Sequence, residues 1–258
     1  LDKIIKNGDI KISAKLSFDQ NGKLIQDTFE IDSEIKDLSL KLFNKKEINN
    51  LSGSLNYTSN NIKFYKLSLD YLGLKLSSEN IDIKKVNDIF LVKGNLKSLK
   101  NVIPNEILLL ILKNNNFKDA ILSSDSNFSL NISKKFKISD LKINSKIDLQ
   151  EVNFNFENSK FKKYLPSFNN NFKFSNHSIT VDYKDKIILD GSGEFLIGDQ
   201  KDKVKYILDF ENQKIKYDID FDLNEIPIII DLINFSKEKN IKAKLKIKGQ
   251  NNKNKNNI

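Results

Sequence analysis

The sequence contains one histidine, His177, and histidine is the side chain that most often moves protons in enzymes. A catalytic histidine needs a nucleophile and an orienting acid close to its ring. The local sequence Asn176-His177-Ser178 does not supply such a set. We therefore expect His177 to be an isolated surface or turn residue without a catalytic role.

Four carboxylates follow His177 closely along the chain: Asp182, Asp185, Asp190 and Glu194. Carboxylate oxygens are the ligands that calcium prefers, but the spacing here does not match the ligand positions of an EF-hand loop. It does not match a repeated Gly-Asp calcium motif either. We expect these carboxylates to occupy solvent-facing positions of strands and turns.

The tripeptide Gly191-Ser192-Gly193 has the composition of a phosphate-binding loop. Such a loop needs a helix directly after it, because the helix N-terminus receives the anion. The residues that follow, Glu194 to Ile197, have the pattern of a strand instead. The tripeptide therefore predicts a kink or bulge within a sheet.

The composition excludes several further kinds of site. The chain has no cysteine, which rules out disulfides, thiolate zinc sites and thiol nucleophiles, and one histidine cannot build a multi-histidine metal site. We therefore expect no enzyme activity, no cofactor and no metal. The net charge is +9, but every basic residue is lysine, and arginine is the residue that nucleic-acid recognition favours. A solvated lysine-rich face is expected, without a nucleic-acid partner.

The elements that would position any site are strands. Apolar residues alternate with polar ones from Ile10 to Phe18, and the alternation returns in segment after segment to Leu245 and Ile247. Because successive side chains of a strand point to opposite faces, each such strand has one apolar and one polar face. Short polar turns separate the strands. The pattern predicts an antiparallel meander.

Two segments interrupt the alternation. Pro104 precedes the apolar run 107–112, and Pro227 precedes the run 228–235, so each predicts a short helix with proline near its first turn. The fold expected is mainly β, a long curved antiparallel sheet with two short helices. Residues 1–250 are expected to form one continuous β-rich segment of a larger protein, with loosely similar halves at about 1–125 and 126–250, and residues 251–258 a low-complexity polar tail.

The apolar face of the sheet must be covered, and the alternation does not say by what. A two-sheet sandwich would bury the face as an ordinary core, whereas a sheet curled into a trough would leave it open to a ligand. An open face of this kind would hold acyl chains through apolar burial alone and would need no polar site residues. Both alternatives stay open at this point.

Several segments resemble the AsmA-like envelope proteins, in particular the large YhdP-type members. The stretch from Gly53 through a series of short strands to Phe90-Leu91-Val92-Lys93-Gly94 is similar to the recurring unit of that family. Val102-Ile103-Pro104 with its apolar helix resembles the family's proline-initiated helix, although Lys118-Asp119 stands where a glycine is usual in the following turn. Tyr164-Leu165-Pro166 is similar to the family's "LP" signature, and Ile226-Pro227 continues the succession.

The resemblance implies a periplasmic protein, anchored in the inner membrane by a segment outside this chain, that shields phospholipid acyl chains between the inner and outer membranes. The partners implied are acyl chains, and a membrane through other parts of the protein. The residues expected to line the groove share one strand parity: Val181, Tyr183, Phe195, Ile197, Val204, Tyr206, Leu208, Phe210, Tyr217, Ile219, Phe221, Leu245 and Ile247. The alternative is a structural or adhesive β-domain of a surface protein, with a closed core and no lipid.

Overall fold

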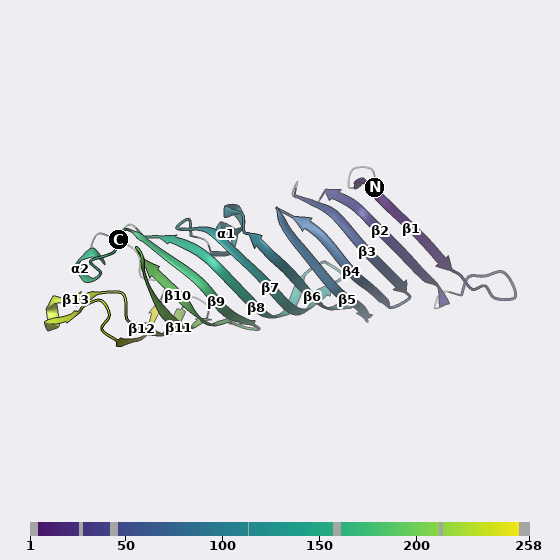
Figure 1. The fold of residues 1–258 in the computed structure, drawn as a ribbon. Coiled ribbons are helices and arrows are strands. Elements are labelled where there is room, and N and C mark those ends of the chain that lie inside the picture. The colour runs from purple at the N-terminus through teal and green to yellow at the C-terminus, as the bar shows by residue number, and fades with distance from the viewer. Residues whose placement is uncertain are drawn as a thin grey trace. The chain divides into compact units, whose positions relative to one another are not determined.

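A computed structural model describes residues 5–25, 28–41, 46–112, 114–156, 161–211 and 214–252. Its elements, labelled in Figure 1, are β1 (Ile5–Lys15), β2 (Glu30–Lys41), β3 (Glu47–Thr58), β4 (Asn61–Tyr71), β5 (Leu74–Val86), β6 (Ile89–Val102), α1 (Asn105–Leu112), β7 (Phe117–Ser133), β8 (Ile138–Asn155), α2 (Phe161–Tyr164), β9 (Asn171–Tyr183), β10 (Ile187–Ile197), β11 (Gln200–Glu211), β12 (Lys214–Leu223), β13 (Ile228–Ile230), the 3-10 turn η2 (Asp231–Ile233), β14 (Phe235–Lys237) and β15 (Ala243–Asn252).

The strands follow one another in a single antiparallel meander. Within the described residues a 13-stranded sheet has the order β1 to β12 and then β15, while β13 and β14 form a separate two-stranded hairpin. The expected mainly β fold with a long antiparallel sheet and short helices is confirmed. Because β1 and β15 end the order without pairing to each other, the sheet is not closed, and it is not the two-sheet sandwich that the alternation left open.

The chain divides into two compact units. Unit 1 comprises residues 1–99 and 124–144, and unit 2 comprises residues 100–123 and 145–258. The similarity expected between residues 1–125 and 126–250 stays a prediction. Of the polar tail expected at 251–258, Asn251 and Asn252 belong to β15, and residues 253–258 lie outside the described part.

The strand pairing of unit 1 aligns the apolar residues of successive strands. Residues directly opposite each other in an antiparallel pair project to the same face. One row of such partners crosses six strands and contains almost only aliphatic and aromatic side chains. Its members are Ala14, Ile31, Tyr57, Ile62, Ile83 and Val92.

One of the two predicted helices forms and the other does not. Helix α1 begins directly after Pro104, whose carbonyl oxygen accepts hydrogen bonds from the backbone N–H groups of Ile107 and Leu108. The helix predicted after Pro227 is wrong, because residues 228–237 form the hairpin β13–β14 around η2. Three consecutive isoleucines favour extended backbone, and Asn234 closes the turn in a left-handed conformation. The second α-helix is α2, which sequence reasoning missed.

The turn between β7 and β8 holds a phenylalanine in a conformation that suits glycine or asparagine. Phe136 has a φ of 55°, and its backbone N–H donates to the carbonyl of Ser133 at 2.8 Å. Its side chain is 88 % exposed, so the packing that it contributes is small. A bulky residue with positive φ costs about 1–2 kcal/mol. This turn therefore carries local backbone strain.

We expect Phe136→Asn to raise the free energy of unfolding by about 1 kcal/mol, because asparagine tolerates the left-handed conformation. Urea unfolding followed by circular dichroism measures the change. Ile138→Asn is the matched control, since Ile138 is also exposed but lies in extended β8, and it should not stabilise the protein. If the Phe136→Asn variant is no more stable than the native protein, Phe136 does not carry backbone strain of this size.

Candidate functional site

The thirteen residues expected to line a groove lie together in unit 2, on one face of the strands β9 to β12 and β15. The register shows this directly, because opposite partners share a face. Val181 pairs with Leu189, Leu189 with Leu208, and Leu208 with Tyr217. A neighbouring row joins Gly191, Tyr206, Ile219 and Ile247. We call this surface the apolar face of unit 2.

Further residues belong to the apolar face that the sequence prediction did not include. They extend the same rows of opposite partners on β9, β10 and β12: Phe174, Ile179, Ile187, Leu189 and Ile215. Their alternation was visible in the sequence, and applying the parity rule to every strand would have found them. The apolar face is therefore larger than the thirteen predicted positions.

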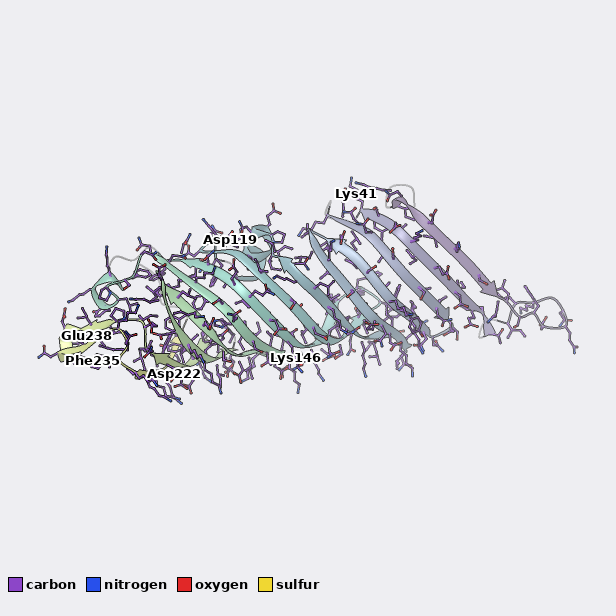
Figure 2. The ribbon with its side chains drawn as sticks, viewed as in Figure 1. Lys41, Asp119, Lys146, Asp222, Phe235 and Glu238 are labelled. Atoms are coloured by element: carbon purple, nitrogen blue, oxygen red, sulfur yellow. The ribbon has the colours of Figure 1, made fainter. Side chains whose placement is uncertain are left out.

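One end of the apolar face is covered. Phe195, Ile197, Val204 and Leu223 form a buried cluster with three residues from outside the 13-stranded sheet, and each member is at most 8 % exposed. These three residues are Phe168, from the segment after α2, Ile226, from the loop after β12, and Ile228 of β13. Figure 2 labels Asp222 near the end of β12 and Phe235 on the hairpin that follows. At this end, which we call the closed end, the apolar face is an ordinary hydrophobic core.

Burial decreases away from the closed end. Val204 is 5 % exposed, whereas Leu208 and Phe210, farther along the same strand, are half-buried. On the edge strand β15, Leu245 and Ile247, which lie level with Val204 and Tyr206, are 37 % and 40 % exposed. At the end of the face away from Val204, Ile187, the partner of Phe210, is 38 % exposed. This second end, which we call the open end, keeps part of its apolar surface in contact with solvent, and that is the surface an apolar ligand could cover.

A buried carboxylate holds the covering loop in place. Asp202 is 5 % exposed, and its carboxylate accepts hydrogen bonds from three consecutive backbone N–H groups, those of Asn224, Glu225 and Ile226, at 2.7, 3.0 and 2.9 Å. Hydrogen bonds to an ionised acceptor are stronger than neutral ones. Asp202 therefore fixes the loop that places Ile226 over the core.

A buried lysine holds the same loop from its carbonyl side. Lys237 of β14 is 2 % exposed, and its ammonium group donates to the carbonyl oxygens of Asn224, Ile226 and Glu238 at 2.9, 2.9 and 3.2 Å. These three acceptors use all three N–H bonds of the ammonium group. Asp202 and Lys237 thus bind the N–H and the C=O groups of one short loop, and we call the two residues together the loop clamp.

The expectation that His177 is a surface or turn residue is wrong. His177 lies in β9 and is 2 % exposed, with Nε2 at 2.9 Å from the carbonyl oxygen of Glu194 and Nδ1 at 3.2 Å from the hydroxyl of Tyr206. Since a carbonyl only accepts, Nε2 carries the proton and Nδ1 accepts from Tyr206. The neutral imidazole therefore satisfies both ring nitrogens as a packed structural group.

A bulge and a glycine make room for this histidine. The register of β9 shifts opposite Ser192 and Glu194, and Asn176 has a φ of 55° at the shift. At Gly193 a β-carbon would approach the His177 ring to 2.3 Å, so only glycine leaves space for it. The bulge predicted at Gly191-Ser192-Gly193 is misplaced: β10 pairs with β11 without a register shift, and the extra residue lies in the neighbouring strand β9, opposite Ser192 and Glu194.

The protein should lose stability as the pH falls from 7.5 to 5.5. Burial lowers the pKa of His177 from its usual 6.5, so below that value the unfolded chain takes up a proton that the folded protein does not bind. The contribution is fully present above about pH 6.5. Urea midpoints at both pH values measure the loss of stability. In the His177→Gln variant the difference between the two midpoints should be smaller.

The effect of His177 on stability can be distinguished from that of the carboxylates, because the two occur in different pH ranges. The pKa of Glu194 is lowered, mainly by a hydrogen bond from Asn176 and then by Lys201, so its contribution to stability is lost only below its usual pKa of 4.5. The window above pH 5.5 therefore reports mainly on His177. If the urea midpoint of the His177→Gln variant changes with pH as much as that of the native protein, His177 is not the cause of the pH dependence.

The opposite face of the same strands is charged and solvated. Asp218, Asp220 and Asp222 of β12 face the lysines of β15, with Lys248–Asp218 at 2.6 Å and Lys246–Asp220 at 3.0 Å. The hydrogen bond from Lys248 lowers the pKa of Asp218. Of the four carboxylates expected at solvent-facing positions, Asp182, Asp185 and Asp190 are exposed, whereas Glu194 is half-buried beside Asn176 and Lys201.

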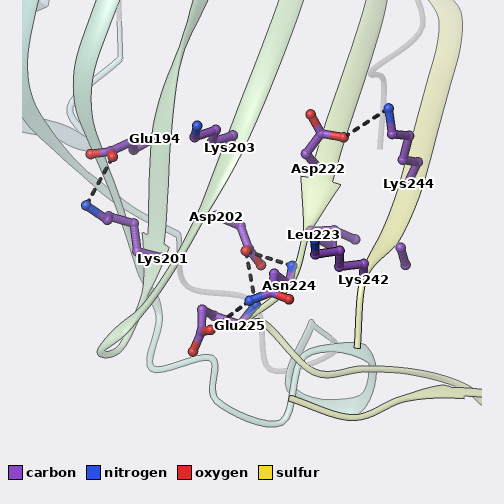
Figure 3. Close-up of a pocket in the computed structure, with 11 residues that line it drawn as sticks. Glu194, Lys201, Asp202, Lys203, Asp222, Leu223, Asn224, Glu225, Lys242 and Lys244 are labelled. Carbon is purple, nitrogen blue, oxygen red and sulfur yellow. Dashed lines mark hydrogen bonds and ion pairs between the residues drawn. The ribbon is translucent and has the colours of Figure 1, made fainter. Parts of the chain in front are cut away.

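A cavity of about 590 Å³ lies at the closed end, and most of the residues that line it are charged (Figure 3). Four lysines and four carboxylates line it, so their formal charges balance. Figure 3 shows Lys201 paired with Glu194 and Lys244 paired with Asp222, while Asp202 binds the loop. The cavity is a charged depression in which Lys201 and Lys244 form ion pairs, and its lining residues do not include those of the open end of the apolar face.

Comparisons of the chain with known protein families, with curated proteins and with solved structures match nothing. Among the described residues there is no helix with the length and apolarity needed to cross a bilayer.

Proposed function

We propose that this chain is a segment of an AsmA-like envelope protein and that its apolar sheet face shields phospholipid acyl chains in transit between the inner and outer membranes. Of the thirteen predicted residues, those at the open end of the apolar face, such as Tyr183, Leu208 and Phe210, contact lipid in this proposal, whereas Phe195, Ile197 and Val204 lie in the covered cluster and do not. The periplasm and an inner-membrane anchor outside this chain belong to the same proposal.

One observation carries the proposal: aliphatic and aromatic side chains continue in register across the four strands β9 to β12 beyond the point where the covering loops end. A face that served only as a core would gain from cover over its whole length, since exposed apolar surface costs about 25 cal/mol per Å². An acyl chain supplies such cover, and about ten buried methylene groups contribute about 8 kcal/mol. No hydrogen-bond donor is required.

Lipid mass spectrometry tests the proposal. The chain is expressed, purified without detergent and extracted, and phospholipid is quantified per protein chain. We expect bound phospholipid at a constant molar ratio that survives gel filtration. A folded protein without lipid, shown by circular dichroism and by the absence of phospholipid in the extract, overturns it.

The closed end supports a second candidate, a structural or adhesive β-domain without lipid. Phe168, Ile226 and Ile228 already cover part of the apolar face, and the same kind of cover could be completed by a second copy of the chain. The two candidates differ in what associates with the open end. A lipid-free dimer in solution favours the second, and a lipid-loaded monomer favours the first.

A further inference from the structure

Two neighbouring hairpin turns of unit 1 lie side by side at one end of the strands that they connect. The β5–β6 turn contains Asn87 and Asp88, and the β7–β8 turn contains residues 134–137. The ammonium group of Lys134 lies 2.5 Å from a carboxylate oxygen of Asp88, so the two turns are side by side. We call the surface that these turns and their flanking residues form the basic rim.

Apolar side chains project into solvent along the basic rim. Phe136 is 88 % exposed and Ile138 is 63 % exposed, while Val86 and Ile89, cross-strand partners beside the other turn, are 41 % and 43 % exposed. Single exposed apolar residues are common on protein surfaces. Four exposed apolar residues on or beside two adjacent turns form a cluster. Because hairpin turns project at the ends of strands, this cluster is accessible to a large surface such as a membrane.

The charge around these apolar residues is strongly positive. Five exposed lysines and two exposed carboxylates, Asp88 and Asp140, lie on the two turns and on the strand residues beside them, the lysines being Lys84, Lys85, Lys134, Lys135 and Lys137. Of these, Lys134 is the one that forms an ion pair within 4 Å in the described part of the chain. An excess of unpaired positive charge attracts a polyanionic surface.

The backbone of the β7–β8 turn presents the aromatic ring outward. The N–H of Ser133 donates to the carbonyl of Lys137 at 3.0 Å, and the N–H of Lys137 donates to the Ser133 hydroxyl at 3.2 Å. The turn is therefore closed by hydrogen bonds at its base. At its tip, the position that glycine or asparagine would occupy without strain holds Phe136. Such strain in an exposed aromatic residue points to a role outside the fold.

We propose that the basic rim docks on the surface of an anionic phospholipid bilayer, with Phe136 and Ile138 entering the headgroup region and the lysines contacting lipid phosphates. Aromatic and aliphatic tips flanked by lysine have the composition of interfacial membrane anchors. Each lysine near an anionic leaflet adds to the attraction. A nucleic acid would satisfy the lysines but leave the apolar side chains in water. This inference does not rest on the lipid-shielding function proposed above.

A tryptophan reporter tests the docking. The chain contains no tryptophan, so Phe136→Trp introduces a single tryptophan at the tip, whose emission is excited selectively at wavelengths that tyrosine does not absorb. We expect a blue shift of its emission, and sedimentation of the protein, with vesicles of phosphatidylcholine and phosphatidylglycerol but not with phosphatidylcholine alone. Adding Lys135→Glu and Lys137→Glu should weaken binding by at least about tenfold. Raised salt should also weaken it.

Leu232→Trp is the matched control. Leu232 is 93 % exposed in unit 2, beside Asp231, whose carboxylate pairs with Lys163 at 3.5 Å, so it lacks an excess of lysine. Its emission should not shift with anionic vesicles. A folded Phe136→Trp protein with unchanged emission overturns the proposal, and so does equal binding to double-stranded DNA without a blue shift. Lipid co-purification is measured without vesicles, so failure of either proposal is seen separately.

Discussion

Leu208→Asp should abolish the co-purification of phospholipid and leave the protein folded. Leu208 is half-buried at the open end of the apolar face, so in the lipid-free protein a carboxylate there can still reach water. Against an acyl chain the same carboxylate would be buried without a partner, which costs several kcal/mol. We expect bound phospholipid per chain to fall at least about tenfold, as measured by lipid mass spectrometry, with the circular dichroism spectrum unchanged.

Two neighbouring variants control this result. Ile207→Lys places a charge one residue away on the opposite face, between the cross-strand partners Asp190 and Asp218, and should change neither lipid loading nor stability. Val204→Asp puts a charge into the covered cluster, where Val204 is 5 % exposed, and should unfold unit 2. Unfolding by Leu208→Asp as well would mean that the open end is part of a closed core.

Asp202→Ala should destabilise the protein by about 3 kcal/mol or more, because three backbone N–H groups of the 224–226 loop lose a charged acceptor. A loop that is no longer held by Asp202 also leaves the hydrophobic cluster less well covered, because Ile226 of this loop is 1 % exposed in the native protein. For a chain of this size the melting temperature should fall by about 6–12 °C. Calorimetry or thermal circular dichroism measures the shift.

The control for the loop clamp is a carboxylate of the same strand pair that lies in solvent. Asp220 pairs with Lys246 at 3.0 Å, and its side chain is 50 % exposed. Such a surface ion pair contributes about 0–1 kcal/mol, so Asp220→Ala should leave the melting temperature nearly unchanged. Equal melting temperatures for the Asp202→Ala and Asp220→Ala variants would show that Asp202 does not hold the loop.

The sequence alone determined which residues share a face. Alternation is a local property, because each side chain of a strand points away from the one before it, so the parity of Val204, Tyr206 and Leu208 could be determined without knowing their neighbours. Helix α1 could also be predicted from local sequence, because Pro104 stands directly before its first residue. The hairpin at 228–237 could not be recognised in this way, since an unbroken apolar run has no period to distinguish helix from strand.

The tertiary structure decided what covers that face and what holds the cover. Phe168 reaches the cluster from a loop far away in the sequence, and Asp202, although it has the parity of Val204, carries no local sign of the loop that it binds. The burial of His177 depends on a bulge in β9 and on the missing side chain of Gly193 in the next strand. Such contacts join residues whose separation along the chain no local pattern records, so only the folded chain places them together.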